Sequence, residues 1–234
     1  IYHAGCIGND AQILTDVLLK SGVDISYLKK ADVKNGHAII QVNAQGENSI
    51  FLYPGSNQMI TDEFIDRVLS DFGKGDIILL QNEISGIKHI VDKAYEREMI
   101  IVLNPSPMNE KLLEIDLNKI SYIILNEVEG EAISQKSEPG KILSYFKAKY
   151  PNVKVMLTLG SKGCIYMDSN EEIYQPIFET AVVDTTAAGD TFTGYFIAGI
   201  ASGREYRDIL KTASCAAAIA VSKKGAAPSI PMYN

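Results

Sequence analysis

The feature that most constrains the fold is a series of short, continuous apolar runs, each followed by a segment with helical spacing. Asp76–Gln81 contains Ile-Ile-Leu-Leu, and comparable runs lie at Met99–Leu103, Tyr122–Leu125 and Val153–Leu159. Runs without polar alternation are typical of strands that are buried on both faces, as in a parallel sheet between helices. The pattern predicts an α/β fold with a three-layer, doubly wound and mostly parallel sheet.

Two features lie outside that alternation. Ala38–Val42 and Ser49–Tyr53 flank a polar turn, which predicts a β-hairpin, and Gly163–Met167 with Glu172–Gln175 predicts a shorter antiparallel pair. No repeat, linker or low-complexity segment interrupts the 234 residues, so we predict one domain over 1–234. Helices are predicted at Ala11–Ser21, Thr61–Phe72, Ile87–Glu98, Glu110–Asp116, Glu127–Gln135, Pro139–Tyr150, Gly189–Ser202 and Tyr206–Lys223.

The composition disfavours several classes of function. A formal net charge of −7, without a basic stripe, argues against nucleic-acid binding. Cys6, Cys164 and Cys215 are far apart and lack CxxC spacing, which favours a reducing compartment and argues against a zinc site. No apolar run reaches the roughly 18 residues that a membrane-spanning helix needs. We therefore expect a cytoplasmic protein that acts on small molecules.

The stretch Asp184–Gly194 combines small residues with two acids and then enters an apolar helix. Ala187, Ala188 and Gly189 leave the backbone bare, so that the first amides of the helix can face an anion. A helix start carries roughly half a positive charge, which suits a phosphate. Asp190 lies in the first turn and can act as a base toward a hydroxyl that approaches the same phosphate. The stretch predicts phosphoryl transfer; the alternative is an Asp that merely caps a buried helix.

The same residues carry a family resemblance. Asp-Thr-Thr-Ala-Ala-Gly-Asp-Thr-Phe at 184–192 resembles the C-terminal signature of the ribokinase-like carbohydrate kinases, and its Ala-Ala-Gly-Asp form is similar to that of ribokinases themselves. The resemblance extends from about Gly5 to Pro231. It implies a ribokinase-like fold in which the hairpin at 38–53 is the remnant of a lid. It also implies ATP as the phosphate donor, with Mg²⁺ and K⁺ as cofactors.

Polar or glycine-rich residues follow several predicted strands, whose carboxyl ends share one edge of a parallel sheet. Asn126-Glu127-Val128-Glu129 resembles the family's Asn-Glu-x-Glu motif, which implies Glu129 on the magnesium side and Asn126 near the phosphates. The alternative is a helix start that carries acids for dipole reasons. Thr158–Gly163 resembles the family's Thr-Leu-Gly-x-x-Gly turn beside the triphosphate. The nucleotide contacts that this turn implies are Thr158, Gly160, Ser161 and Gly163.

The C-terminal part of the chain resembles the family's adenine wall and monovalent-cation site. Ser214 matches a nucleotide-binding position at which we expect Asn, and Gly189 is expected to contact the nucleotide as well. Glu83 matches an acid that touches the sugar, and Asp190 is expected to contact it too. The residues that match the potassium site are Asp184, Thr186, Ala220, Lys223, Gly225 and Ser229.

The resemblance implies an ATP-dependent kinase for a primary hydroxyl of a pentose, with ribose, converted to ribose 5-phosphate, as the first candidate. Family members open with a strand that bears a sugar-binding Asp and with a Gly-Gly loop, and neither precedes Ile1, so we expect an N-terminally incomplete chain. Other carbohydrate or nucleoside kinases of the family, or a nucleotide-binding fragment without turnover, are the alternatives. A dehydrogenase is disfavoured, because no GxGxxG follows a predicted strand. Pairing through the lid, as in the family, implies a homodimer that uses the hairpin at 38–53.

Overall fold

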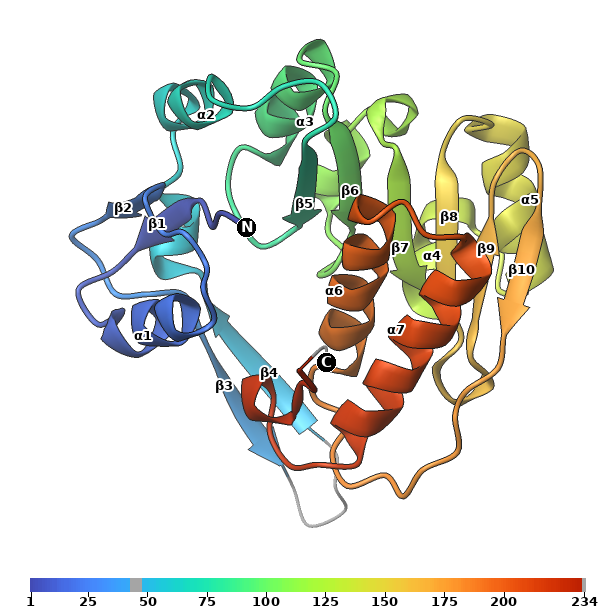
Figure 1. Cartoon of the computed structure of the whole chain (residues 1–234). Helices are drawn as coiled ribbons and strands as arrows, with labels where there is room; N and C mark the ends of the chain where they lie inside the picture. Colours follow the sequence, from blue (N-terminus) through green and yellow to red (C-terminus); the bar gives the residue numbers. More distant parts are fainter. Residues whose placement is uncertain (43–47, 233–234) are drawn as a thin grey trace. The chain divides into compact units, whose positions relative to one another are not determined.

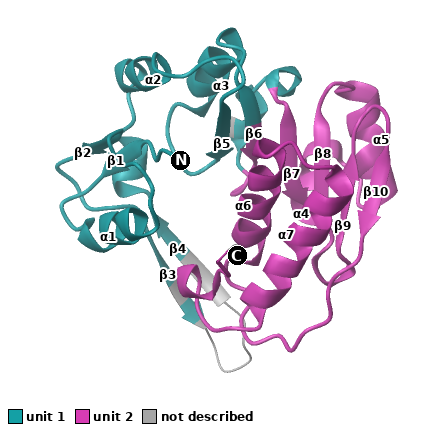
Figure 2. Ribbon diagram, viewed as in Figure 1, with its two compact units in different colours: residues 1–101, 109–119 teal, residues 102–108, 120–234 magenta. Residues whose placement is uncertain are grey.

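The structure is a computed structural model that describes residues 1–42 and 48–232 of the chain. The chain forms two compact units (Figure 2). The first unit consists of residues 1–101 and 109–119, and the second consists of residues 102–108 and 120–234. One strand, β6 (Ile100–Asn104), begins in the first unit and ends in the second. The single domain expected over 1–234 stays a prediction.

The first unit contains two small two-stranded sheets. β1 (Gly5–Ile7) pairs in parallel with β2 (Leu28–Lys30), and β3 (His37–Val42) pairs antiparallel with β4 (Asn48–Tyr53). The second pair confirms both strands of the predicted hairpin to within one residue. The turn residues 43–47 lie outside the described part of the chain.

The remaining elements of the first unit are mainly helices, and α2 (Asp62–Leu69) begins at a side-chain cap. The Thr61 hydroxyl accepts a hydrogen bond from the Phe64 N–H at 3.3 Å and so caps the start of this helix. The segment predicted as a helix at Glu110–Asp116 forms a short 3-10 helix at Glu110–Glu114. The other elements are α1 (Gln12–Lys20), β5 (Ile77–Gln81), α3 (Ile87–Glu96) and 3-10 helices at Gly55–Gln58 and Leu117–Lys119.

The second unit is built on a sheet in the order β10-β9-β8-β7-β6. β6, β7 (Tyr122–Asn126) and β8 (Lys154–Thr158) run in parallel, whereas β9 (Cys164–Met167) and β10 (Glu172–Gln175) join antiparallel at the edge. This order confirms the prediction of a mostly parallel sheet that ends in a short antiparallel pair.

Helices cover both faces of that sheet. α6 (Ala188–Ala201) and α7 (Tyr206–Val221) lie together on one face, and α4 (Glu127–Ser134) and α5 (Pro139–Lys149) lie on the other (Figure 1). The strands between them are almost fully buried, as expected for continuous apolar runs. The central side chains with 0 or 1% exposure are Val102, Leu103, Ile123, Leu125, Val155, Met156 and Leu157.

Candidate active site

The start of α6 is an open turn of small residues. Ala187, the N-cap, has φ +60° and ψ +15°, the left-handed conformation that L-residues rarely adopt. Ala188 N–H donates to the Thr185 carbonyl at 3.3 Å. Gly189 and Asp190 are exposed, and a Cβ placed on Gly189 would meet no atom within 4 Å. The positive end of a helix with room beside it can accept a phosphate, and Asp190 lies in the same turn.

Asp184 ties the loop before α6 to the loop after α7. One carboxylate oxygen accepts the Thr186 N–H at 2.9 Å, and the other accepts the Gly225 N–H at 2.9 Å. The hydrogen bonds from Thr186 and Gly225 lower the pKa of Asp184 to about 2. The carbonyl of Val221, the last residue of α7, accepts both the Val183 and the Asp184 N–H. Hydrogen bonds therefore connect three of the expected cation ligands, Asp184, Thr186 and Gly225.

The other three expected cation ligands lie on the same C-terminal segment. Lys223 lies two residues before Gly225, and its N–H donates to the Ala220 carbonyl at 3.0 Å. Ser229 is fully buried and its hydroxyl donates to the Ala226 carbonyl at 2.7 Å. Among the described residues, no cluster of three or more His, Cys, Asp or Glu side chains could hold a metal ion. The groups that the structure describes in this region are the Asp184 carboxylate and the backbone carbonyls of Ala220, Val221 and Ala226, each of which accepts hydrogen bonds from the protein itself.

Asn126 and Glu129 form a reciprocal capping box at the start of α4. The Asn126 side chain accepts the Glu129 N–H at 2.9 Å, and the Glu129 carboxylate accepts the Asn126 N–H at 3.0 Å. Glu129 is only 7% exposed. One of its carboxylate oxygens thus has a structural partner, and a magnesium ion would have to use the other. The Asn-x-x-Glu spacing is the sequence signal for this box, and it is independent of the family motif that implies a metal site.

Thr158 and Asn126 stand opposite each other where β8 and β7 end. The Thr158 hydroxyl donates to the Leu125 carbonyl at 3.3 Å. The prediction that two strand-end motifs share one edge of the sheet is therefore confirmed for this pair. Among the glycines of the turn after Thr158, Gly160 has φ +56° with open space around it. Ser161, beside it, is exposed.

Gly163, an expected nucleotide contact, is required to be glycine by the packing of the neighbouring backbone. It has φ +100°, and a Cβ there would lie 2.1 Å from the Gln175 carbonyl oxygen. The close approach of the β10 backbone therefore requires glycine whether or not a phosphate binds. Lys162, next to it, forms a 3.8 Å ion pair with Glu127 of α4, which holds the turn beside the capping box.

Ser214 lies on α7, half-buried, with its hydroxyl oxygen 4.0 Å from the Cys164 sulfur. Cys164 stands opposite Thr158 in the β8–β9 ladder. Burial raises the pKa of the Cys164 thiol to about 11, so it stays neutral and unreactive near neutral pH. Cys164 thus neighbours two of the expected nucleotide-binding positions, as the register partner of Thr158 and through its side-chain contact with Ser214.

Glu83 is the one expected site residue that belongs to the first unit. It follows β5, is exposed, and its backbone carbonyl accepts a hydrogen bond from the Gln58 side chain at 3.1 Å. Its expected contact with a sugar stays a prediction.

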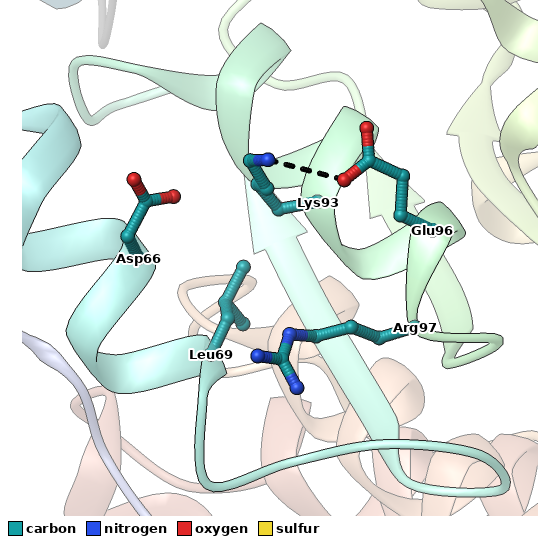
Figure 3. A pocket seen from close by; sticks show the side chains of 5 residues that line it. All are labelled: Asp66, Leu69, Lys93, Glu96 and Arg97. Carbon is teal, nitrogen blue, oxygen red and sulfur yellow. Dashed lines mark hydrogen bonds and ion pairs between the residues drawn. The ribbon is translucent and has the colours of Figure 1, made fainter.

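A surface pocket of about 370 Å³ lies between α2 and α3 in the first unit (Figure 3). Lys93 pairs with Glu96 at 3.1 Å, Asp66 pairs with His89 at 2.9 Å, and the Arg97 guanidinium donates to the Phe72 carbonyl at 3.1 Å. Its charged groups are therefore engaged by the protein itself. None of the expected site residues lines it.

A membrane-spanning helix is absent from the described part of the chain, because none of the helices there has the length and hydropathy that such a span requires.

Comparisons with known proteins agree with the motifs. The model of the pfkB family of carbohydrate kinases matches residues 2–232. A ribokinase of Schizosaccharomyces pombe is 32% identical, with 97% of this chain and 75% of the relative covered. A deoxyribokinase of Salmonella typhi is 29% identical, with 91% and 73% covered. A structure of Arabidopsis thaliana ribokinase complexed with ribose and ATP is 28% identical with a TM-score of 0.83, and the match covers 98% of this chain and 78% of that one. The predicted ribokinase-like fold is confirmed.

Proposed function

The chain belongs to the pfkB family of carbohydrate kinases, and we propose that within this family it transfers the γ-phosphate of ATP to a primary hydroxyl of ribose. Family membership makes it a phosphotransferase that acts on a sugar hydroxyl and uses ATP with a divalent metal. The observation that carries the proposal is the start of α6, where an exposed Asp190 stands in the first turn of an open helix end. The likeness to ribokinases supports ribose as the acceptor.

In this proposal the residues of one turn divide the chemical work. Asp190 accepts the proton of the sugar hydroxyl as the hydroxyl oxygen attacks the γ-phosphate. The amides at Ala187–Gly189 would face the negative charge that develops on the transferred group, for which the Ala188 N–H would have to leave the Thr185 carbonyl. Magnesium, when bound with ATP, neutralises phosphate charge, and the Glu129 carboxylate oxygen that does not accept the Asn126 N–H would hold it, with Asn126 near the phosphates.

Potassium is proposed to act on the same turn from behind. Asp184 joins the loop before α6 to the residues after α7, and the carbonyls around it suit a monovalent cation. A cation there would stiffen the segment that runs from Asp184 into Ala187. Binding of the phosphate would then require less ordering of that turn.

The identity of the sugar has a second candidate with an observation behind it. The deoxyribokinase is nearly as similar to this chain as the ribokinases are, at 29% against 32% identity. The two sugars differ by one hydroxyl, and a site that hydrogen-bonds this group would favour ribose strongly. A comparison of kcat/KM for ribose and 2-deoxyribose therefore decides between the two candidates.

The test is ADP release from ATP and Mg²⁺ by the 234-residue chain with ribose, 2-deoxyribose, fructose or inosine, in K⁺ and in Na⁺. Ribose-dependent, K⁺-stimulated release is expected, and Asp190→Asn controls for a contaminating kinase. Preference for another sugar would replace ribose in the proposal. ADP binding without turnover on any sugar would favour a nucleotide-binding fragment. Failure to bind ADP at all would contradict the proposed nucleotide site.

We also propose that the hairpin of β3 and β4 is the surface through which two copies pair. Ile39 and Phe51 are partners in the strand register and share one face of the hairpin, where they are 57 and 59% exposed. Leu52, on the other face, is 65% exposed. The expected result is a dimer in sedimentation at micromolar concentration, which Phe51→Lys converts to a monomer. A wild-type monomer would contradict this part of the proposal.

A further inference from the structure

Thr191, the residue after Asp190, has a buried hydroxyl without a hydrogen-bond partner among the residues that the structure describes. The side chain is 2% exposed and belongs to the second turn of α6. A buried polar group normally finds a partner, and one that does not destabilises the state in which it is found. This orphan hydroxyl belongs to the residue that directly follows the proposed base, Asp190.

Three other hydroxyls inside the helices of this protein, one of them buried, share one hydrogen-bond arrangement. Ser134, Ser144 and Thr212 donate to the carbonyl four residues earlier, at 2.6, 2.7 and 2.7 Å. The matching acceptor for Thr191 is the carbonyl of Ala187. That carbonyl accepts the Thr191 N–H at 2.9 Å but does not accept the hydroxyl. A carbonyl oxygen has two lone pairs and can accept both.

Ala187 is also the residue with the left-handed backbone. Its conformation therefore sets the direction of the carbonyl that Thr191 would use. Ala187 is one of the residues whose peptide faces the phosphate in the proposed function. A small reorientation of this peptide on phosphate binding would change the distance from its oxygen to the Thr191 hydroxyl.

We propose that Thr191 is a positioning residue for the phosphate-binding turn. When a phosphate occupies the start of α6, the Thr191 hydroxyl donates to the Ala187 carbonyl and holds the turn in its bound geometry. The hydroxyl is too deeply buried to touch the nucleotide, so it acts through Ala187. This inference rests on the proposed function, because it takes the start of α6 as the phosphate site. The hydrogen bond that the free protein lacks becomes part of the free energy of nucleotide binding.

The test compares thermal stability without ligand and affinity for AMPPNP·Mg²⁺, an ATP analogue that keeps the γ-phosphate but is not cleaved, in the same variants. Thr191→Val removes the hydroxyl at nearly constant shape. It is expected to raise the melting temperature of the ligand-free chain by about 2–4 °C. It is also expected to weaken AMPPNP·Mg²⁺ binding, measured by calorimetry, by roughly three- to tenfold. A merely structural hydroxyl would not produce these opposite effects.

Two further variants isolate the hydroxyl. Thr191→Ser keeps it and is expected to bind AMPPNP·Mg²⁺ as the wild type does. Thr193→Val removes the same atom from another buried threonine of α6, 5% exposed, and is expected to leave the affinity unchanged.

Several results would overturn the inference. Wild-type affinity in Thr191→Val would show that the hydroxyl is not coupled to binding. A lower melting temperature or a failure to fold in Thr191→Val would show that the hydroxyl already stabilises the free protein, and Thr191→Ala would confirm that reading. If the wild type itself bound no AMPPNP·Mg²⁺, the proposed function would fail first and this inference with it. That case is recognised from the wild type alone.

Discussion

The carboxylate of Asp184 and the backbone N–H of Gly225 are 2.9 Å apart, although the two residues are separated by 41 positions in the sequence. The other carboxylate oxygen accepts the Thr186 N–H. One side chain thus closes the segment that contains α6 and α7 into a loop whose two ends are held together. Because the start of α6 belongs to this segment, the Asp184 carboxylate supports the turn that carries Asp190.

Acid should weaken this connection at a specific pH. The pKa of Asp184 is lowered to about 2 in the folded chain, below its usual value of about 4 in unfolded chains. Its stabilising effect is therefore complete above pH ~4 and is lost as the pH falls toward 2. Urea unfolding at pH 5, 4, 3 and 2.5 should show wild type and Asp184→Asn converging as the pH falls. A difference that does not change with pH would contradict the assignment.

Asp190→Asn should reduce kcat by about 10²–10⁴, the usual effect of a positioned base, and leave the dissociation constant for ADP·Mg²⁺ within a few-fold of the wild type. The reason is that Asn keeps the shape of the side chain but cannot accept a proton. Asp208→Asn is the matched control, because Asp208 is an exposed aspartate in the first turn of α7. Near-normal turnover in Asp190→Asn would leave Asp190 as a residue of the helix start without a chemical role.

Glu129 should show two separable effects. Glu129→Gln keeps an oxygen that can accept the Asn126 N–H, so the melting temperature should change little while the Mg²⁺ concentration for half-maximal activity rises. Glu129→Ala removes the capping box and should lower the unfolding free energy by about 0.5–2 kcal/mol as well. Urea unfolding and a magnesium titration measure the two effects. An unchanged magnesium requirement in Glu129→Gln would restrict Glu129 to its capping role.

The sequence predicts the central strands well because their signal is local. The run at Tyr122–Leu125 becomes β7 (Tyr122–Asn126) almost unchanged, since burial on both faces demands continuous apolar residues. The sequence signal for the start of α6 is local too, because Ala187, Ala188 and Gly189 come directly before the apolar residues of the helix. The family resemblance then supplies the roles of residues whose chemistry is not evident from spacing alone.

Contacts between distant segments could not be predicted in the same way. The Tyr122 and Tyr206 hydroxyls are 2.8 Å apart, and the Lys154 ammonium donates to Tyr122 at 3.0 Å, so α7 is fixed to the amino ends of two strands. The requirement for Gly163 comes from the β10 backbone, which packs against it. The orphan hydroxyl of Thr191 depends on the orientation of one carbonyl. None of these three features has a signal within a window of neighbouring residues.

Ala187 should be a site at which glycine increases stability. An L-residue in the left-handed region costs roughly 1–2 kcal/mol that glycine does not pay, whereas glycine adds about 0.4–1 kcal/mol of entropy to the unfolded chain. Ala187→Gly should therefore raise the unfolding free energy by about 0.5–1 kcal/mol, as measured by urea denaturation. Ala188→Gly is the matched control, because Ala188 begins the helix proper and glycine there should lower the unfolding free energy. If Ala187→Gly is destabilising by as much as Ala188→Gly, the left-handed backbone at 187 is not a source of strain, and the direction of its carbonyl must be held by something other than φ.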